Sequence, residues 1–192
     1  MPKLPTRRSI RLPGYNYSTN GAYYITICAN NRKCIFGEVK NTKCVGAGLA
    51  PAHNKTIELS IIGGIIDKQW RNIPNQFENT NIYEYVIMPN HFHGIIIIQN
   101  EGNKRAAARA APTYLGQIIG SFKSKCVVDC LKYIRINNLN LSAKIWQRSL
   151  YDHIIRNDKS LNNIRQYICN NPATWDSDME NPHKKGMPNN NI

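Results

Sequence analysis

Residues 81–99 read Asn-Ile-Tyr-Glu-Tyr-Val-Ile-Met-Pro-Asn-His-Phe-His-Gly-Ile-Ile-Ile-Ile-Gln. Two runs rich in aromatic and β-branched residues, 81–88 and 91–99, are separated only by Pro89-Asn90. Runs of this kind favour strands, and a short polar break between them favours a tight turn. The stretch therefore predicts a β-hairpin.

Hydrophobic spacing on either side of this hairpin predicts the other elements. Strands are expected over 22–28 and in a short stretch near 145–155, where aromatic and β-branched residues gather. Helices are expected over 56–73, from a cap at Thr113 to about Arg135, and over 158–170, where apolar residues recur at helical spacing. This order predicts an α+β fold, with an antiparallel sheet that carries helices on one face.

The chain has 192 residues, about one domain. Residues 1–20 are basic and rich in proline, which predicts an extended arm. The folded domain is expected over 21–175, with loop insertions near 41–55 and 100–112, where glycine and other small residues gather. The polar, Pro- and Asn-rich residues 176–192 predict a flexible tail.

The composition indicates a folded protein that binds anions. Hydrophobic residues make up 42% and charged residues 19% of the chain, and the net charge is +13 with a pI near 9.6. Nucleic acid is therefore the leading partner class. The longest aliphatic run is Ile95–Ile98, which predicts no membrane-spanning segment. With no secretory signal in the sequence, a cytoplasmic location is expected.

His91-Phe92-His93 is the most informative triplet for chemistry. On a strand, residues two apart point to the same face about 7 Å apart, so two imidazoles can meet one cation while Phe92 faces the core. Two solvent-facing histidines remain the alternative. The six cysteines form no Cys-x-x-Cys pair, so a structural zinc site is not predicted.

A second candidate is the segment Gln166–Pro172 at the end of the last predicted helix. Tyr167 and Asn171 are four residues apart, which places a phenol and an amide on one helical face. If this face meets the two histidines, the Asn171 oxygen completes a three-ligand metal site beside a tyrosine nucleophile. The alternative is a structural role, with a core Tyr167 and a helix that ends at Asn171-Pro172.

Three motifs together resemble a known enzyme family. Met-Pro-Asn-His-Phe-His (88–93), Tyr-Asp-His-Ile-Ile-Arg (151–156) and Tyr-Ile-Cys-Asn-Asn-Pro (167–172) are similar to motifs of the HUH single-strand transposases with one catalytic tyrosine, and most of all to the REP-associated tyrosine transposases. The segments 10–15, 21–30 and 32–37 are similar to that subgroup as well, so the resemblance extends over most of residues 7–175.

The resemblance implies a ferredoxin- or RRM-like nuclease fold and a role for each matching residue. His91 and His93 are expected to be metal ligands, Tyr167 the nucleophile and Asn171 a third ligand. The implied cofactor is Mg²⁺ or Mn²⁺, and the implied substrate is single-stranded DNA beside an imperfect hairpin. Relatives include monomers and homodimers, and the sequence does not decide between them. Action on DNA also implies association with the nucleoid.

The implied reaction is cleavage and rejoining of DNA through a 5′-phosphotyrosine. A tyrosine near pKa 10 is mostly protonated at pH 7, so a base or the metal must assist it. His153 is a candidate for that base, and the alternative is a structural histidine that links the last strand to the last helix.

Phosphate contacts are expected from several basic side chains, each of which can instead be a solvated surface charge. The candidates are Arg7, Arg8, Arg11, Lys123, Lys125, Arg148 and Arg165.

Two alternative functions remain open at this point. One is a domesticated, non-catalytic protein that binds hairpin DNA. The other is a metal-dependent phosphodiesterase that uses water, in which Tyr167 is dispensable.

Overall fold

The computed structural model describes residues 15–42, 54–100, 114–140, 142–182 and 184. No helix in these ranges is long and apolar enough to cross a membrane.

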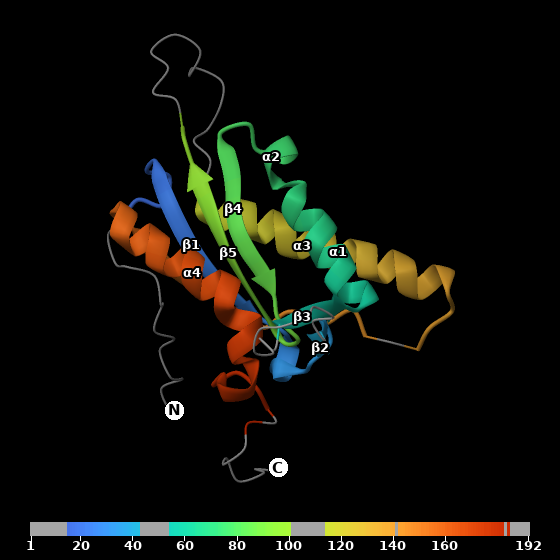
Figure 1. Ribbon diagram of the computed structural model, residues 1–192. Coiled ribbons are helices and arrows are strands. Elements are labelled where there is room, and N and C mark those ends of the chain that lie inside the picture. Colours follow the sequence, from blue (N-terminus) through green and yellow to red (C-terminus); the bar gives the residue numbers. More distant parts are fainter. Residues whose placement is uncertain (1–14, 43–53, 101–113, 141, 183, 185–192) are drawn as a thin grey trace, which may run out of the picture.

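A four-stranded antiparallel sheet in the order β4-β5-β1-β6 forms the centre of the molecule (Figure 1). Its strands are β1 (Gly21–Cys28), β4 (Thr80–Ile87), β5 (His91–Ile98) and β6 (Tyr151–Ile155). The predicted hairpin is confirmed, because β4 and β5 pair directly across Met88–Asn90.

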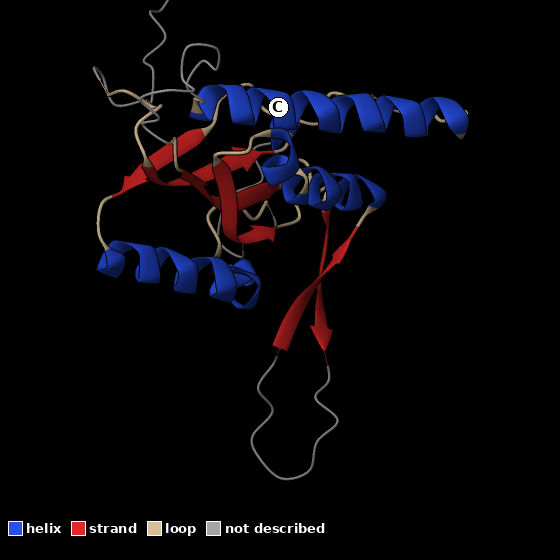
Figure 2. Ribbon diagram, turned by 90° about the horizontal axis from the view of Figure 1, so that it is seen from above, coloured by secondary structure: helices blue, strands red, loops and turns tan. Residues whose placement is uncertain are grey.

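Helices pack on this sheet, and the predicted α+β class is confirmed. They are α1 (Ile61–Arg71), the short α2 (Ile73–Gln76), α3 (Leu115–Ile136) and α4 (Asp158–Thr174), with single 3₁₀ turns at Asn30–Arg32 (η1) and Trp175–Ser177 (η2). α1 and α3 contact each other on one face of the sheet, while α4 lies on the opposite face (Figures 1 and 2).

The main core lies between the sheet and the α1–α3 layer. Phe92 turns toward this layer and packs against Trp70 and Phe122, with ring centroids 4.5 and 5.8 Å away. Gly94 is required beside them, because a Cβ at this position would overlap the Trp70 ring. The opposite face carries a smaller apolar cluster of Tyr24, Ile95, Ile155 and Ile168, which holds α4 on the sheet.

The predicted helix over 56–73 is wrong in its first turn. Residues 54–59 form β3 (Asn54–Leu59), which pairs with β2 (Gly37–Thr42) in a separate two-stranded ribbon (Figure 2). The helix begins only after Ser60, whose hydroxyl caps it by accepting from the Gly63 amide at 3.1 Å. Residues 54–59 pair with β2, and this pairing outweighed the helical spacing of the apolar residues in the same stretch.

Three further boundaries differ from the sequence predictions. The strand expected near 145–155 is confined to β6, preceded by a single bridge between Ala29 and Trp146. α4 continues through Pro172 to Thr174, so Asn171 does not end the helix. The expected loop insertions near 41–55 and 100–112 lie mostly outside the described residues, and the described ends of the first belong to β2 and β3.

Candidate active site

The two histidines of β5 share one face of the sheet, as their spacing predicts. Their ring centroids are 4.6 Å apart, and both side chains are buried although neither is apolar. The intervening Phe92 points to the other face, into the α1–α3 core. Strand alternation thus builds a polar pair directly behind a hydrophobic core.

Each imidazole is held through its Nδ1 atom. His91 Nδ1 lies 2.9 Å from Asn90 Oδ1, and His93 Nδ1 lies 2.8 Å from both the Tyr24 hydroxyl and Thr26 Oγ1. When Nδ1–H donates to these oxygens, the lone pair is on Nε2, the atom that can bind a cation. His91 Nε2 is buried and has no hydrogen-bond partner among the described residues.

Burial also keeps both rings neutral. It lowers the pKa of His91 to about 4 and holds the pKa of His93 well below its ordinary value, where the neighbouring His91 lowers it further. Neutral imidazole is the form that binds metal ions.

α4 brings Tyr167 to these histidines. The helix begins at an Asn157 cap, whose side chain accepts from the Ser160 amide at 2.8 Å, and Ile168 anchors it in the smaller apolar cluster. The Tyr167 hydroxyl lies 3.5 Å from His93 Nε2, and 49% of the residue is exposed. The face of α4 that carries Tyr167 therefore meets the histidine face of the sheet.

Asn171 lies one turn further along the same side of α4. It is only 1% exposed, and its side-chain amide forms no well-aligned hydrogen bond among the described residues, although it lies close enough to His91 and Tyr167 to counteract the effect of burial on the pKa of both. Buried amides without such a hydrogen bond are uncommon, and an unseen water or ion is one of the ordinary explanations. With His91 Nε2, Asn171 supplies a second inward polar atom that a bound cation would satisfy.

The nitrogen atoms of His91 and His93 and the amide oxygen of Asn171 are suitable ligands for a divalent cation. In the described part of the chain, no three His, Cys, Asp or Glu side chains are grouped closely enough to hold a metal ion, so Asn171 remains the candidate for a third ligand beside the two histidines. Two imidazole nitrogens and one amide oxygen are compatible with Mn²⁺ and also with zinc or nickel, whereas Mg²⁺ prefers oxygen ligands.

Sequence reasoning missed three side chains that support the site. Tyr24 and Thr26 position His93 through its Nδ1 atom. The third is Asp178, whose Oδ2 lies 3.9 Å from His91 Nε2.

Asp178 belongs to the segment for which a flexible tail was expected. The first residues of that segment pack against the site, because the Glu180 carbonyl accepts from Asn90 Nδ2 at 2.6 Å and Asn181 is buried. A polar sequence with no hydrophobic period gives no sign of this contact.

The pKa of Tyr167 is raised, mainly by burial and further by the Asp178 carboxylate.

Tyr24, His93, Tyr167 and Asn171 line an open cleft of about 740 Å³, and Arg32 and Tyr151 lie on its walls. This volume is in the range of small-molecule and nucleotide sites. His153 lies on β6 in register with Tyr24 and is exposed, so it is on the site's face of the sheet and one strand farther from His93 than Tyr24.

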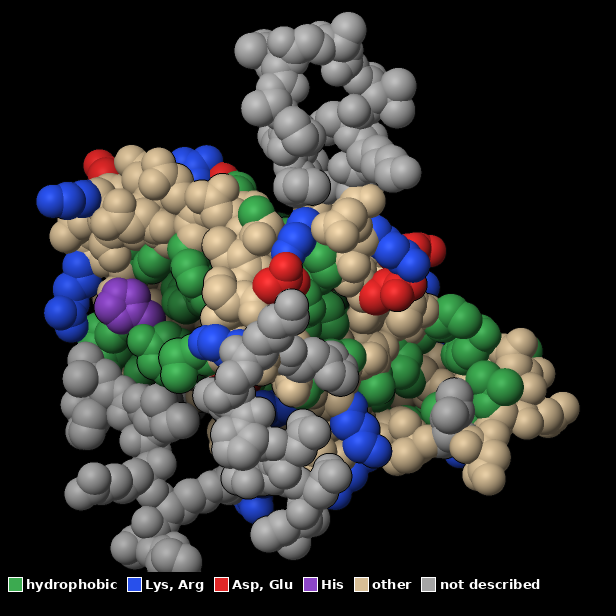
Figure 3. Space-filling view, turned by 60° about the horizontal axis from the view of Figure 1, so that its bottom comes forward, with side chains coloured by type: hydrophobic (Ala, Val, Ile, Leu, Met, Phe, Trp, Pro, Cys, Tyr) green, Lys and Arg blue, Asp and Glu red, His purple; other side chains and the backbone are tan. Residues whose placement is uncertain are grey.

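The four predicted phosphate contacts that the structure describes do not form one patch. Lys123 and Arg148 lie near the cleft, since Lys123 Nζ donates to the Gln147 carbonyl at 2.7 Å and the neighbours of Arg148 line the cleft. Arg165 on α4 is engaged by Glu84, with Nε 2.7 Å from Oε1. Figure 3 shows lysine and arginine side chains spread over the surface with acidic side chains between them.

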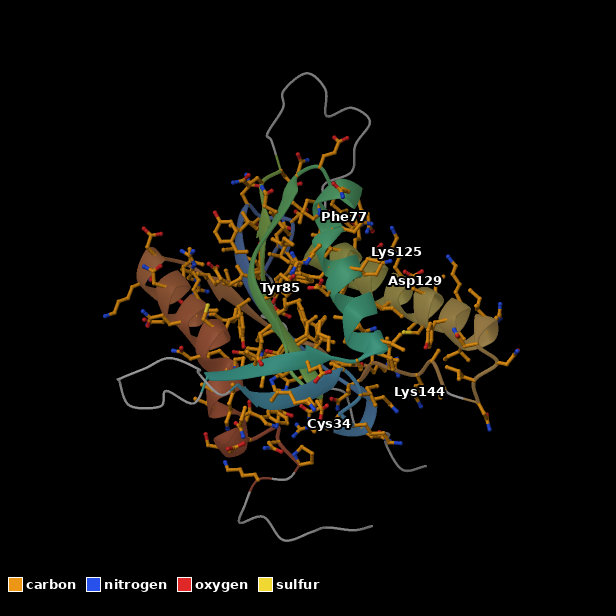
Figure 4. All side chains as sticks on the ribbon, turned by 45° about the vertical axis from the view of Figure 1, so that its right-hand side comes forward. Cys34, Phe77, Tyr85, Lys125, Asp129 and Lys144 are labelled. Carbon is orange, nitrogen blue, oxygen red and sulfur yellow. The ribbon has the colours of Figure 1, made fainter. Side chains whose placement is uncertain are left out.

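The structure does not bring Lys125 to the site. Its Nζ donates to Gln76 Oε1 at 2.5 Å, and it lies on the side of α3 away from α4 (Figure 4). The expected contacts Arg7, Arg8 and Arg11 lie outside the described residues.

Known proteins resemble this chain in sequence and in fold. No family model matches the chain. A relative from Haemophilus influenzae, an uncharacterized protein, is 38% identical over 179 residues, which cover 90% of this chain and 91% of the relative. Among solved structures, a REP-associated tyrosine transposase bound to a REP hairpin matches with a TM-score of 0.52 and 17% identity, over 85% of this chain and 73% of that one. The chain therefore belongs to the same family as the Haemophilus influenzae protein and has the fold of a REP-associated tyrosine transposase.

Proposed function

We propose that this protein is a metal-dependent single-stranded DNA endonuclease and strand transferase, a transposase that cleaves near hairpins through a 5′-phosphotyrosine. The observation that carries the proposal is the 3.5 Å approach of the Tyr167 hydroxyl to His93 Nε2, beside two buried polar groups that form no well-aligned hydrogen bond, His91 Nε2 and the Asn171 amide. A structural tyrosine would be buried in the core, whereas Tyr167 is half exposed in an open cleft.

His91, His93 and Asn171 would hold the divalent cation, which would supply Lewis-acid stabilisation of the charge that develops at the scissile phosphate. Tyr24 and Thr26 keep His93 oriented through its Nδ1 atom. Orientation of this kind maintains the ligand geometry and the basicity of the ring.

Tyr167 performs the covalent step. Its hydroxyl oxygen forms a bond to phosphorus, the bond from phosphorus to the 3′ oxygen breaks, and the departing oxygen takes up a proton as a free 3′-OH. The phenolic proton leaves to a general base. Because the phosphotyrosine conserves the bond energy, a second 3′-OH can attack it and rejoin the DNA without ATP.

The substrate is inferred from charge and from the fold. A net charge of +13 favours a polyanion, and the solved structure of the same fold carries a REP hairpin. We propose the same class of DNA, a hairpin with an adjacent single strand, and therefore a cytoplasmic location with the nucleoid.

The test is an adduct assay on single-stranded hairpin oligonucleotides from the flanks of the protein's own gene, labelled at either end and incubated with Mg²⁺ or Mn²⁺. A covalent adduct on the fragment downstream of the cut is expected, and it should disappear in Tyr167→Phe and with EDTA. Tyr83→Phe, an equally exposed tyrosine on β4, is the matched control and should keep the adduct.

Two results would contradict the proposal. Cleavage that persists in Tyr167→Phe would indicate a phosphodiesterase that uses water. Binding of several flanking hairpins by the wild-type protein without any adduct would indicate a non-catalytic DNA-binding protein.

A further inference from the structure

Tyr151, the first residue of β6, is a second exposed tyrosine in the same cleft. Thr26 of β1 is opposite Tyr151 on one side and opposite His93 on the other, so all three side chains lie on one face of the sheet. Tyr151 is 48% exposed and lines the cleft together with Tyr167.

Among the described residues, the Tyr151 ring has one aromatic neighbour. Tyr24 meets it in an edge contact, with centroids 6.4 Å apart and planes at 71°. Tyr24 is itself fixed by its 2.8 Å contact with His93, so this support is rigid. No described residue makes a second ring contact with Tyr151, so part of the ring borders the open cleft.

An exposed aromatic ring at this place suits an unpaired base. Bases of single-stranded DNA stack on aromatic side chains, largely regardless of their identity. The backbones of Tyr151 and His93 are separated by two strand spacings, about 10 Å, which is comparable to the reach of one nucleotide from its phosphate to its base. The exposed tyrosines Tyr83 and Tyr114 do not line this cleft.

We propose that Tyr151 is the stacking platform for an unpaired base next to the phosphate that Tyr167 attacks. The inference rests on the proposed function and adds a subsite to it. Tyr151 would hold the strand in register by the ring alone, and its hydroxyl would take no part in the reaction.

The experiment compares Tyr151→Ala, Tyr151→Leu, Tyr151→Phe and Tyr151→Trp in binding of the hairpin oligonucleotide, measured by fluorescence anisotropy. We expect the Tyr151→Ala and Tyr151→Leu variants to raise the Kd for the oligonucleotide about 5- to 100-fold. The Tyr151→Phe and Tyr151→Trp variants should leave this Kd within about twofold of the wild type. Tyr114→Ala, an exposed tyrosine outside the cleft, is the control and should bind as the wild type does.

A scan of single abasic nucleotides along the oligonucleotide locates the base. One abasic position near the cleavage point should weaken binding of the wild type and have no further effect on Tyr151→Ala, because the stacking partner is already absent. Thermal unfolding of each variant separates loss of binding from loss of folding, and Leu provides a second aliphatic variant if Ala does not fold.

The outcomes separate this inference from the proposed function. If the wild type forms the adduct, and the Tyr151→Ala and Tyr151→Leu variants bind the oligonucleotide as tightly as Tyr151→Phe, the stacking role is wrong and the proposed function stands. If Phe loses as much affinity as Ala, the hydroxyl rather than the ring is responsible, and stacking is again wrong. If the wild type neither binds nor cleaves the oligonucleotides, both proposals fail.

Discussion

The two faces of the central sheet have opposite characters, although β5 contributes to both. On the α1–α3 face, Phe92 packs among the aromatic rings of Trp70 and Phe122. On the α4 face, His91 and His93 alternate with it and are equally buried, yet His91 Nε2 has no partner among the described residues.

The α1–α3 face stabilises the fold, whereas the α4 face, in the proposed function, binds the ligand. A buried polar atom without a partner costs about 1–3 kcal/mol, whereas a buried aromatic side chain is stabilising. A protein keeps such atoms where a ligand satisfies them, and such departures from local rules are expected at functional sites. The following predictions test this contrast.

The largest effect is expected on the apolar face. Phe92→Ala should lower the free energy of unfolding by about 3–5 kcal/mol, because it leaves a cavity beneath Trp70. Tyr167→Phe on the other face should change it by less than about 0.5 kcal/mol, because the side chain is half exposed. Urea unfolding measures both changes in the free energy of unfolding. Similar losses in the two variants would contradict the contrast between the two faces.

Acid should destabilise the metal-free protein through the polar face. The pKa of His91 is lowered to about 4 in the folded state, so its contribution to stability is complete above the unfolded pKa, about 6.5, and is lost as the pH falls from there toward 4. The expected loss is on the order of 3 kcal/mol. Unfolding in EDTA at each pH measures it.

His91→Asn should reduce this pH dependence without abolishing it, because burial also lowers the pKa of His93. His153→Asn, which leaves the buried pair intact, serves as the control. If the free energy of unfolding of His91→Asn depends on pH as strongly as that of the wild type, His91 is not a source of the destabilisation in acid.

Neighbouring tyrosines on β1 allow a direct comparison of the two faces. Tyr24→Phe removes a hydroxyl that contacts His93 Nδ1 and should weaken Mn²⁺ binding about tenfold. Tyr23→Phe removes a hydroxyl on the other face, which donates to the Thr19 carbonyl at 2.6 Å, and should leave Mn²⁺ binding unchanged. Isothermal titration calorimetry gives both affinities, and equal values for the two variants would oppose a role for Tyr24.

The smallest effect is expected for single phosphate contacts. Arg148→Ala, beside the cleft, should weaken DNA binding a few-fold and reduce the dependence of log Kd on log salt by about 1. Lys125→Ala should change neither, because Lys125 does not line the cleft and its Nζ contacts Gln76. Titrations at several salt concentrations measure the slope, and a comparable change in Lys125→Ala would place DNA on the α3 face as well.

The sequence by itself determined the features that depend on near neighbours in the chain. The hairpin, the shared face of His91 and His93, and the helical face shared by Tyr167 and Asn171 follow from periods of two and about four residues. These periods do not depend on the surrounding fold, so the residues could be placed on shared faces before the fold was known, whereas their expected roles as metal ligands and nucleophile came from the family resemblance.

Only the tertiary structure decided the features that depend on distant partners. Residues 54–59 became a strand because a second strand pairs with them, and α4 lies on the histidine face because Ile168 finds its apolar cluster there. Tyr24 and Asp178 joined the site in the same way, as partners of distant residues. Pairing and packing across long stretches of chain have no local period, and for that physical reason the sequence pattern alone could not assign them.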